Sequence, residues 1–574
     1  MCGIFCYICS NYDSTKANQT LHSCFEVLNN RGPDYDSTLW YNSSVLFHAS
    51  VLWHQGDALC KQPLETDRTV LVFNGDIFQK RDDVRESDTL WLLKQIEACH
   101  NQDDLLQLVA SLRGPFSVIF LRKQENRVYF ARDAVGRNSL LFGRSEDGSI
   151  LISSVFGNVS STVVYELPPY GLYYIDLEAI NDSNPFGLLP WTDDCSQLEQ
   201  TFGNTISVSW KNGLEKTLSS VKHNFNFHEL LTKKESSDED VFEYLFKTAA
   251  ISDLCAQLLT ALRQSVEERI LNTAAFCKTC LQSRRDCLHP KVGILFSGGI
   301  DCSILALLAD EFVPADNPIE LLNVAFEKIS RAKVQSSHID WNVPDRVTGR
   351  TSLEELHRLR PNRKWIFVEI NVSRNELSDR RQTISNLVYP LQNVLDESLG
   401  AALWFASRGA GLENGEPYRS TSRVLLLGSG ADELFAGYTR HKTAFERCLR
   451  NHGETDAAYE MAFQALEDEL NLDWRRLPSR NLARDDRVIC DNRVTPRSPY
   501  LQEDFIAAVL SLRASQRCYH PLGPGIGDKL ILRLCACKLG LTQASTLRKR
   551  ALQFGSRIAD RKQNASDRSV YLND

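Results

Sequence analysis

Short apolar runs alternate with segments of helical pattern through the C-terminal half of the chain. Each run is partly β-branched and too short for a helix, so it predicts a buried strand. These strands are expected at 292–296, 321–326, 365–372 and 424–428. Strands alternating with helices predict an α/β fold with a doubly wound parallel sheet, whose ligands bind at the carboxyl ends of the strands.

The N-terminal segment has a different pattern, in which many short strands follow one another. Its first helix is expected to end at Arg31-Gly-Pro-Asp34. Further helices are expected at about 88–99 and 104–113, the latter capped by Asp103 or Asp104 and ended by Gly114-Pro115. Strands are expected at 70–73, 116–122, 127–132, 139–143, 150–154 and 171–177. This order predicts a layered α+β domain.

The periodicity of apolar residues weakens in the segment between these two parts of the chain. Polar stretches at 182–185 and 233–240 are typical of exposed linkers or insertion edges. Helices at 241–255 and 258–270 are expected to lead into the second domain. The predicted organisation is therefore a domain at 1–180, a linker or insertion at 181–245, and a domain at 246–574.

Bulk properties narrow the class of partner. The 574 residues carry a net charge of -8 and the pI is near 5.9, which argues against nucleic acid or an anionic membrane surface. The sequence has no run near the ~20 apolar residues of a membrane span and no signal-peptide pattern. We expect a soluble, cytoplasmic protein, either a monomer or a homodimer, with small-molecule partners.

The 17 cysteines are scattered without framework spacing, which is typical of reduced thiols. Cys277-Lys-Thr-Cys280, with Cys287 nearby, has a spacing found in metal sites. A single Cys-x-x-Cys without a second pair or a histidine pair is a weak signal. The favoured interpretation is helix-borne core thiols, and zinc is the alternative.

The stretch Ser297-Gly298-Gly299-Ile-Asp301-Cys-Ser303 lies between a predicted strand and a predicted helix. Glycines bring backbone N–H groups close to an anion, and a helix N-terminus favours negative charge. No lysine follows the glycines, so this is not a GxxxxGK[ST] loop. An ordinary turn is the alternative. The motif resembles the SGGxDS loop of ATP-pyrophosphatases, which implies that Ser297, Ser303 and the glycines bind ATP phosphates and that Asp301 holds Mg²⁺.

The last predicted strand of the sheet opens into Gly428-Ser-Gly-Ala-Asp432. Acidic residues that open a helix usually complement its dipole. At the carboxyl end of a sheet strand, Asp432 is expected to be a second Mg²⁺ ligand opposite Asp301.

Cys2 becomes a potential nucleophile if Met1 is removed, because its thiol then lies beside a free α-amino group. Asn74 and Gly75 follow a predicted strand. An Asn-Gly pair usually marks a hairpin turn. Here the Asn74 amide and the Gly75 N–H can instead form an oxyanion hole.

Five segments together resemble the glutaminase domain of class II amidotransferases, an N-terminal-nucleophile fold with αββα layers. They are Cys2-Gly-Ile4, Arg31-Gly-Pro-Asp34, Asn74-Gly-Asp-Ile-Phe78, Arg132-Asp-Ala-Val-Gly136 and Pro168-Pro-Tyr-Gly171. The resemblance implies that Cys2 attacks the glutamine amide, that Asn74 and Gly75 stabilise the oxyanion, and that Arg31 and Asp88 bind glutamine. This chain has His48-Ala-Ser50 where the family has a His-x-Arg whose arginine binds the glutamine carboxylate.

The second domain resembles that of glutamine-dependent asparagine synthetases, and most closely the asparagine synthetase domain-containing protein 1 subfamily. The similarity lies in SGGIDCS, GSGADELFAGY, 480–487, 497–501, 549–556, 343–350 and 396–408. It implies ATP and Mg²⁺ as cofactors, and ATP, glutamine and an aspartate-like carboxylate as small-molecule partners. Gly428 would bind ATP, and Lys549 or Arg550 would stabilise charge on the phosphates.

Two differences leave other functions open. Ser429 stands where the family has a glutamate that serves proton transfer, and the family's threonine-containing aspartate-binding segment is replaced by Ser398-Leu-Gly-Ala-Ala402. A serine cannot act as a carboxylate base. Asparagine synthesis is the main hypothesis. The alternatives are amidation of a different carboxylate and a catalytically degenerate regulatory protein.

Overall fold

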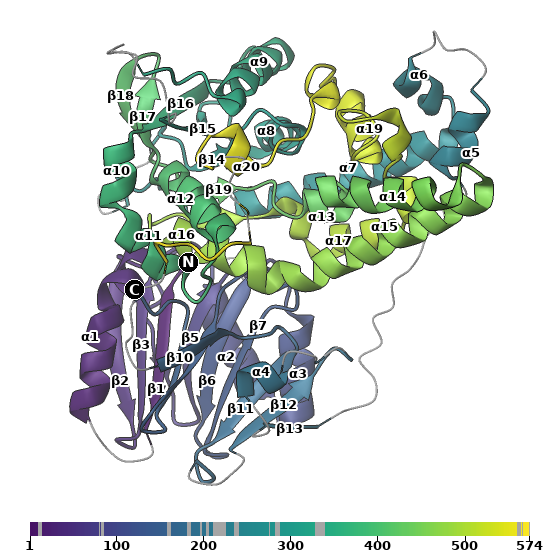
Figure 1. Ribbon diagram of the computed structural model, residues 1–574. Helices are drawn as coiled ribbons and strands as arrows, with labels where there is room; N and C mark the ends of the chain where they lie inside the picture. The colour runs from purple at the N-terminus through teal and green to yellow at the C-terminus, as the bar shows by residue number, and fades with distance from the viewer. Residues whose placement is uncertain are drawn as a thin grey trace.

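The computed structural model describes residues 1–9, 14–79, 81, 85–157, 162–180, 185–193, 195, 198–202, 206–209, 225–234, 240–274, 276–281, 287–327, 339–559, 564 and 566–572. Two β-sheets form the N-terminal part and a third forms the C-terminal part, with the N-terminus at the boundary between them (Figure 1). No helix in these ranges is long and apolar enough to cross a membrane.

The first sheet has the strand order β10-β8-β9-β1-β3-β2 and is antiparallel. Its strands are β1 (Gly3–Ile8), β2 (Tyr35–Tyr41), β3 (Val45–Val51), β8 (Leu141–Ser145), β9 (Ile150–Ser153) and β10 (Thr162–Glu166). Helix α1 (Ser14–Arg31) covers its outer face with Ala17, Leu21, Cys24 and Leu28, which recur at helical spacing and are buried. The helix ends at Arg31, as the Arg-Gly-Pro-Asp segment predicts.

The second sheet has the order β13-β12-β11-β7-β6-β5-β4. Its strands are β4 (Leu64–Glu65), β5 (Thr69–Gly75), β6 (Phe116–Arg122), β7 (Arg127–Arg132), β11 (Gly171–Asp176), β12 (Phe186–Pro190) and β13 (Ile206–Val208). Helices α2 (Asp88–Ala98) and α3 (Gln102–Ser111) pack on its outer face, and α4 (Leu198–Phe202) lies beside the core between the sheets. The predicted αββα layering is confirmed. Asn101, not Asp103 or Asp104, caps α3, because its side chain accepts from both of their backbone N–H groups.

The third sheet has the order β18-β17-β16-β15-β14-β19-β20, and its five strands from β16 to β20 in this order are parallel. Its strands are β14 (Val292–Leu295), β15 (Ile319–Phe326), β16 (Trp365–Val372), β17 (Ala410–Glu413), β18 (Glu416–Arg419), β19 (Val424–Leu426) and β20 (Thr495–Arg497). The chain proceeds from β14 through β15 to β16 and later returns to the other side of β14 as β19. The strand order therefore reverses between β14 and β19, where such sheets bind ligands.

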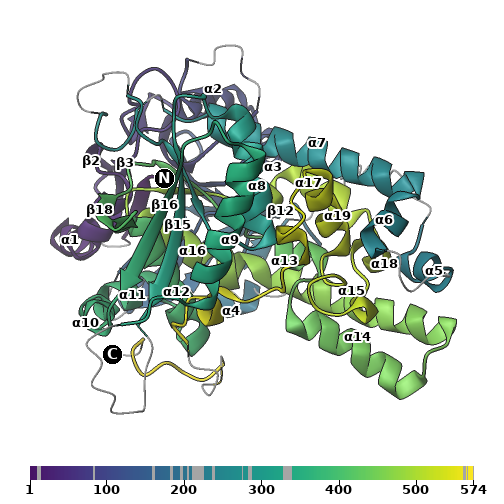
Figure 2. The same cartoon turned by 90° about the horizontal axis from the view of Figure 1, so that it is seen from above.

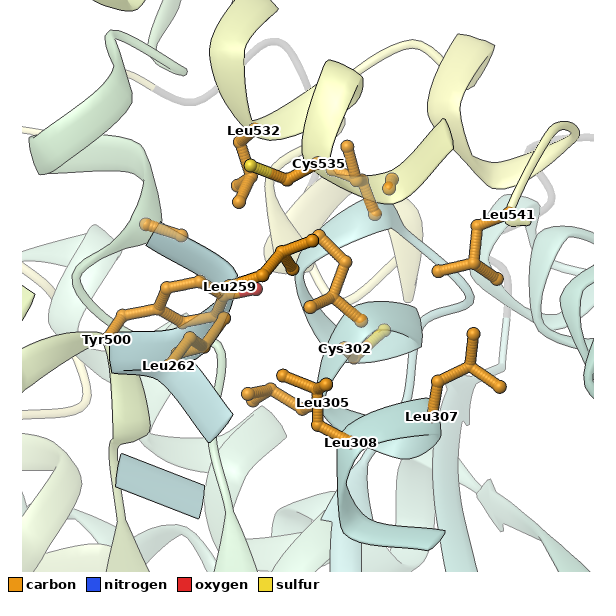
Figure 3. Close-up of a cluster of buried hydrophobic side chains, with 14 of the residues drawn as sticks. Leu259, Leu262, Cys302, Leu305, Leu307, Leu308, Tyr500, Leu532, Cys535 and Leu541 are labelled. Atoms are coloured by element: carbon orange, nitrogen blue, oxygen red, sulfur yellow. The ribbon is translucent and has the colours of Figure 1, made fainter. Parts of the chain in front are cut away.

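Helices cover both faces of this sheet, which confirms the predicted doubly wound architecture. The helices are α7 (Ala249–Leu271), α8 (Ile300–Phe312), α9 (Pro344–Leu359), α10 (Arg374–Asp379), α11 (Arg381–Val388), α12 (Val394–Arg408), α16 (Ala483–Cys490), α19 (Leu530–Lys538) and α20 (Leu552–Gly555). In Figure 2, α8 and α9 lie to one side of β15 and β16 and α11 lies to the other. Figure 3 shows leucines of α7 and α8 packed beneath Leu532 and Cys535 of α19. This apolar core fixes α8, whose first turn enters the site.

A smaller helical layer completes the C-terminal part. It contains α13 (Ala431–Phe435), α14 (Thr439–His452), α15 (Asp456–Leu477), α17 (Glu503–Leu510) and α18 (Ala514–Arg517). A π-helical turn (Pro478–Leu482) joins α15 to α16, and short 3-10 turns occur at Pro499–Leu501, His520–Leu522 and Ala544–Thr546.

The region expected as a linker, residues 181–245, contributes elements to both the N-terminal and the C-terminal part. β12 and β13 lie beyond residue 180 and extend the second sheet. Helix α6 (Val241–Phe246) packs against α7, and α5 (Phe227–Thr232) packs against α18, with Phe227 and Leu245 fully buried. The helix expected at 241–255 ends at Phe246, and α7 begins at Ala249. Residues 182–184 and most of the acidic run 235–240 lie outside the described residues.

Candidate active site

The loop after β14 has a backbone that only glycine adopts without strain. Gly298 has φ +76°, and a Cβ there would lie 2.4 Å from the Thr348 carbonyl atoms. Helix α9 holds the loop in place: the Thr348 hydroxyl donates to the Ser297 carbonyl at 2.8 Å, and the Ser352 hydroxyl donates to the Gly298 carbonyl at 2.6 Å. The loop is thereby fixed against a second element that is distant in sequence.

Asp301 and Asp432 lie together, as the strand reversal predicts. Asp301 is in the first turn of α8 and Asp432 is in the first turn of α13. Between them lies the buried Lys529, whose Nζ is 2.8 and 2.7 Å from the Asp301 carboxylate oxygens and 2.6 Å from Asp432 Oδ1. Lys549 makes a second ion pair with Asp432. The Lys529 ammonium group therefore contacts both carboxylates.

This charge cluster holds the Asp432 carboxylate ionised. Burial acts to raise the pKa of Asp432, but Lys529 and Lys549 outweigh it and hold that pKa well below its usual range. Burial acts to lower the pKa of Lys549, and Asp432 and Asp301 raise it above the usual value. Asp432 and Lys549 are thus both charged near neutral pH.

A cavity of about 330 Å³ opens beside this cluster. Ser297, Gly299, Asp301, Gly428, Asp432 and Lys549 all line it. An adjoining cavity of about 50 Å³ is lined by Ser297, Gly299, Asp301, Asp345, Lys529, Arg533, Arg548, Lys549 and Arg550. The smaller cavity is strongly basic, a suitable environment for phosphate. Ser303 is fully buried and lines neither cavity.

Lys529 and Asp345 are site residues that the sequence motifs did not identify. Lys529 has no local motif around it, and 228 positions separate it from Asp301. Asp345 lies in the 343–350 segment that carries the family resemblance, but nothing local assigned it a role. Burial raises its pKa to about 7, although Lys549 and Arg550 act to lower it. Asp345 Oδ2 has no hydrogen-bond partner among the described residues.

The far wall of the larger cavity combines apolar and charged side chains. Leu395, Leu399 and Leu403 line it from one face of α12. Arg484 also lines it and is held by Asp396 at 2.7 Å and by Asp485 at 2.7 Å. This wall includes Leu399, which lies in the Ser398–Ala402 segment.

Cys2 lies in the second candidate site, in the N-terminal part. It is buried, and Gln62 Nε2 lies 3.8 Å from its Sγ. Burial raises the pKa of this thiol, although the Met1 ammonium acts to lower it. That ammonium donates to Thr495 Oγ1 in β20 at 2.9 Å. The candidate nucleophile therefore lies at the contact between the two parts.

Asn74 and Gly75 lie at the end of β5. The Asn74 amide donates to Ser117 Oγ at 3.1 Å, and its backbone carbonyl accepts from Asn138 at 2.9 Å. A Cβ on Gly75 would lie 2.4 Å from the Pro115 carbonyl oxygen, so a larger residue does not fit. Their role as an oxyanion hole stays a prediction.

Asp88 and Arg31 are both buried near Cys2. Asp88 opens α2, and its carboxylate accepts from the Thr89 N–H at 2.8 Å. Burial and the charge of Asp76 raise the pKa of Asp88 to about 6. Arg31 donates to the Cys2 carbonyl at 3.2 Å and pairs with Asp486 at 3.0 Å. The predicted contact of both residues with glutamine stays a prediction.

A cavity of about 20 Å³ lies between the two sites. Asn138, which bonds the Asn74 carbonyl, lines it on one side. Leu427, Ser429 and Asp485 line both this cavity and the large one. This small cavity is therefore lined both by a residue that contacts the Asn74 segment and by residues of the large cavity.

Comparison with protein families agrees with this architecture. A glutamine amidotransferase domain matches residues 1–164, and asparagine synthase matches residues 284–565. Asparagine synthetase domain-containing protein CG17486 of Drosophila melanogaster is 40% identical over 100% of both chains. Asparagine synthetase domain-containing protein 1 of Homo sapiens is 34% identical over 97% of this chain and 95% of its own.

A third relative carries an enzyme name but matches a shorter region. It is the putative asparagine synthetase [glutamine-hydrolyzing] 1 of Methanocaldococcus jannaschii, which is 29% identical over 39% of this chain and 32% of its own. The two relatives in the preceding comparison match from end to end. The chain therefore belongs to the family of asparagine synthetase domain-containing proteins, with a glutamine amidotransferase domain followed by an asparagine synthase domain.

Proposed function

We propose that the protein is a glutamine-dependent, ATP-consuming amidotransferase that converts aspartate to asparagine. In the synthetase site the aspartate side-chain carboxylate attacks the α-phosphorus of ATP, and pyrophosphate leaves. In the glutaminase site Cys2 attacks the glutamine amide, ammonia leaves, and water then hydrolyses the glutamyl thioester to glutamate and free Cys2. Ammonia then displaces AMP from the acyl-adenylate and forms the amide. The cluster of Asp301, Lys529 and Asp432 is the observation that carries this proposal.

The residues of this cluster suit both ATP and Mg²⁺. Lys529 and Lys549 supply fixed positive charge toward the β- and γ-phosphates without reorganisation. Asp301 and Asp432 offer carboxylate oxygens, which Mg²⁺ prefers. The Lys529 ammonium group already contacts both carboxylates. When bound there, Mg²⁺ would neutralise negative charge on the leaving pyrophosphate.

The test is release of pyrophosphate and AMP from Mg·ATP by the purified chain, with aspartate and with either glutamine or ammonium. We expect aspartate-dependent release that Asp301→Asn abolishes and that Asp316→Asn, an exposed aspartate beyond the same helix, leaves unchanged. Cys2→Ala should abolish the reaction with glutamine and preserve it with ammonium. Folded protein that binds no ATP and releases no pyrophosphate would contradict the proposal.

A different carboxylate is the second candidate, favoured by the apolar wall of the cavity. Leu395, Leu399 and Leu403 are poor partners for the charged α-amino and α-carboxylate groups of aspartate. They suit a carboxylate with an apolar side chain. Pyrophosphate release that aspartate does not stimulate, but that an apolar carboxylic acid does, would favour this second candidate.

A further inference from the structure

Three cysteines and one histidine converge outside the two sites described above. They are Cys277, Cys280, Cys287 and His289, in the segment between α7 and β14. One ligand atom from each lies within 4.8 Å of all the others. The sequence favoured core thiols here because no histidine pair accompanied the Cys-x-x-Cys. The structure differs from that interpretation, because none of the three cysteines lies in a helix and only Cys277 is buried. His289 lies with them.

Two distances in this group are close to the edges of a tetrahedral site. Zinc bonds of about 2.3 Å to sulfur and 2.0–2.1 Å to nitrogen separate ligand atoms by about 3.5–3.8 Å in a tetrahedron. His289 Nδ1 lies 3.6 Å from Cys277 Sγ and 3.3 Å from Cys280 Sγ. The other ligand-atom separations are within 4.8 Å. A Zn²⁺ ion at the centre therefore requires these ligand atoms to approach one another by up to about 1 Å.

Neighbouring groups hold the ligands in place. The Thr279 hydroxyl lies 3.1 Å from Cys277 Sγ. Asn317 donates to the backbone carbonyls of Cys287 and His289 at 3.4 and 3.3 Å. The four ligands are thus positioned by groups that do not themselves bind metal.

We propose that Cys277, Cys280, Cys287 and His289 bind one structural Zn²⁺ ion. Four protein ligands fill a tetrahedral shell and leave no position for substrate, which is typical of structural rather than catalytic zinc. Binding converts three thiols to thiolates and releases their three protons to solvent. The site is chemically distinct from the oxygen-ligand cluster of Asp301 and Asp432, which suits Mg²⁺.

The position of this site indicates that it stabilises the contact between neighbouring segments. The Lys278 N–H donates to the Thr421 carbonyl at 3.0 Å, and the Phe276 ring lies 6.3 Å from the Trp53 ring in the N-terminal part. His289 is three residues before β14, the strand that leads into the Ser297–Ser303 loop. Zinc would therefore fix the entry to that strand and its contact with the amidotransferase domain.

The experiment measures metal in the full chain, purified with reduced thiols and without chelators. Elemental analysis should find about one zinc per chain, and a zinc-responsive dye should detect its release after the thiols are blocked. Replacement by Co²⁺ should give thiolate-to-cobalt charge-transfer absorption and the strong visible bands of a tetrahedral site. A Cys277→Ser, Cys280→Ser double variant should lose the metal, whereas Cys448→Ser in α14 should retain it.

His289 provides a variant that does not depend on a buried thiol, because its side chain is exposed. His289→Cys should keep one zinc per chain and shift the cobalt bands toward those of a four-sulfur site, while His289→Ala should bind zinc at least tenfold more weakly. The proposal is overturned if folded, reduced protein binds neither zinc nor cobalt stoichiometrically. A disulfide among these cysteines, stoichiometric iron, or zinc content unchanged in the double variant would also overturn it.

Discussion

Arg31 and Asp486 form an ion pair at 3.0 Å in which each side chain is only 1% exposed. The two residues are 455 positions apart, at the end of α1 and within α16. The same arginine donates to the Cys2 carbonyl, and Asp486 also accepts from the Ser139 N–H at 3.1 Å. The candidate nucleophile and the synthetase domain are therefore connected through one buried pair.

Removing one partner of this pair should strongly destabilise the protein. Asp486→Asn leaves the Arg31 charge buried without its counterion, which costs about 3–5 kcal/mol in comparable pairs. We expect the free energy of unfolding to fall by that amount in a denaturant titration. Asp147→Asn, which removes the exposed pair with Lys16, should change it by less than about 1 kcal/mol. Equal effects of the two substitutions would contradict the role given to the buried pair.

Lys529→Met should abolish most ATP cleavage without removing Lys549. Asp301 and Asp432 would lose the cation that they share, and the phosphates would lose a fixed positive charge. Loss of one such preorganised group costs about 10²–10³ in rate. Single-turnover pyrophosphate release measures the effect, and Lys538→Met at the other end of α19 is the matched control. An unchanged rate in folded Lys529→Met would exclude Lys529 from the site.

Gly298→Ala tests the loop that precedes α8. Gly298 and Gly415 both have positive φ, +76° and +88°. A methyl group added at Gly298 would lie within 2.5 Å of backbone atoms of α9, whereas one added at Gly415 would meet nothing within 4 Å. Gly415→Ala therefore measures the conformational cost alone, about 1 kcal/mol. We expect Gly298→Ala to cost more stability and to abolish Mg·ATP binding in calorimetry. Normal ATP binding by Gly298→Ala would rule out a close approach of this loop to phosphate.

Asp345 should make the protein less stable as the pH rises. Its pKa is about 7 when folded and near the ordinary value of 3.8 when unfolded. Between these values the folded state holds one more proton than the unfolded state, so stability falls with increasing pH. Asp345→Asn should remove a decrease on the order of 4 kcal/mol, at about 1.4 kcal/mol per pKa unit.

The comparison between wild type and Asp345→Asn isolates this residue from others that titrate in the same window. Burial lowers the pKa of His48 to about 4, which makes stability rise with pH and opposes the effect of Asp345. Thermal melting of both proteins from about pH 4.5 to 8 gives the difference, because all other groups cancel. Parallel curves for the two proteins would show that Asp345 titrates normally.

Local patterns in the sequence were sufficient for much of the architecture. Strand–helix alternation after residue 291 determined the parallel sheet, and β16 was predicted with its observed bounds, 365–372. The predicted helix boundaries and helix caps were less accurate. Asn101 caps α3 although two aspartates follow it, and the helix expected through 255 stops at Phe246. Periodicity reports which face of an element is buried, but the last turn of a helix depends on capping contacts.

The sequence by itself also predicted that Asp301 and Asp432 lie close together, because each follows a strand of the same parallel sheet at its carboxyl end. Their role as Mg²⁺ ligands stays a prediction. Only the tertiary structure decided the partners of these carboxylates. Lys529 reaches both from 228 and 97 positions away, and Arg31 meets Asp486 across the domain boundary. Motifs and periodicity describe neighbours along the chain, whereas these ion pairs depend on which distant elements pack together.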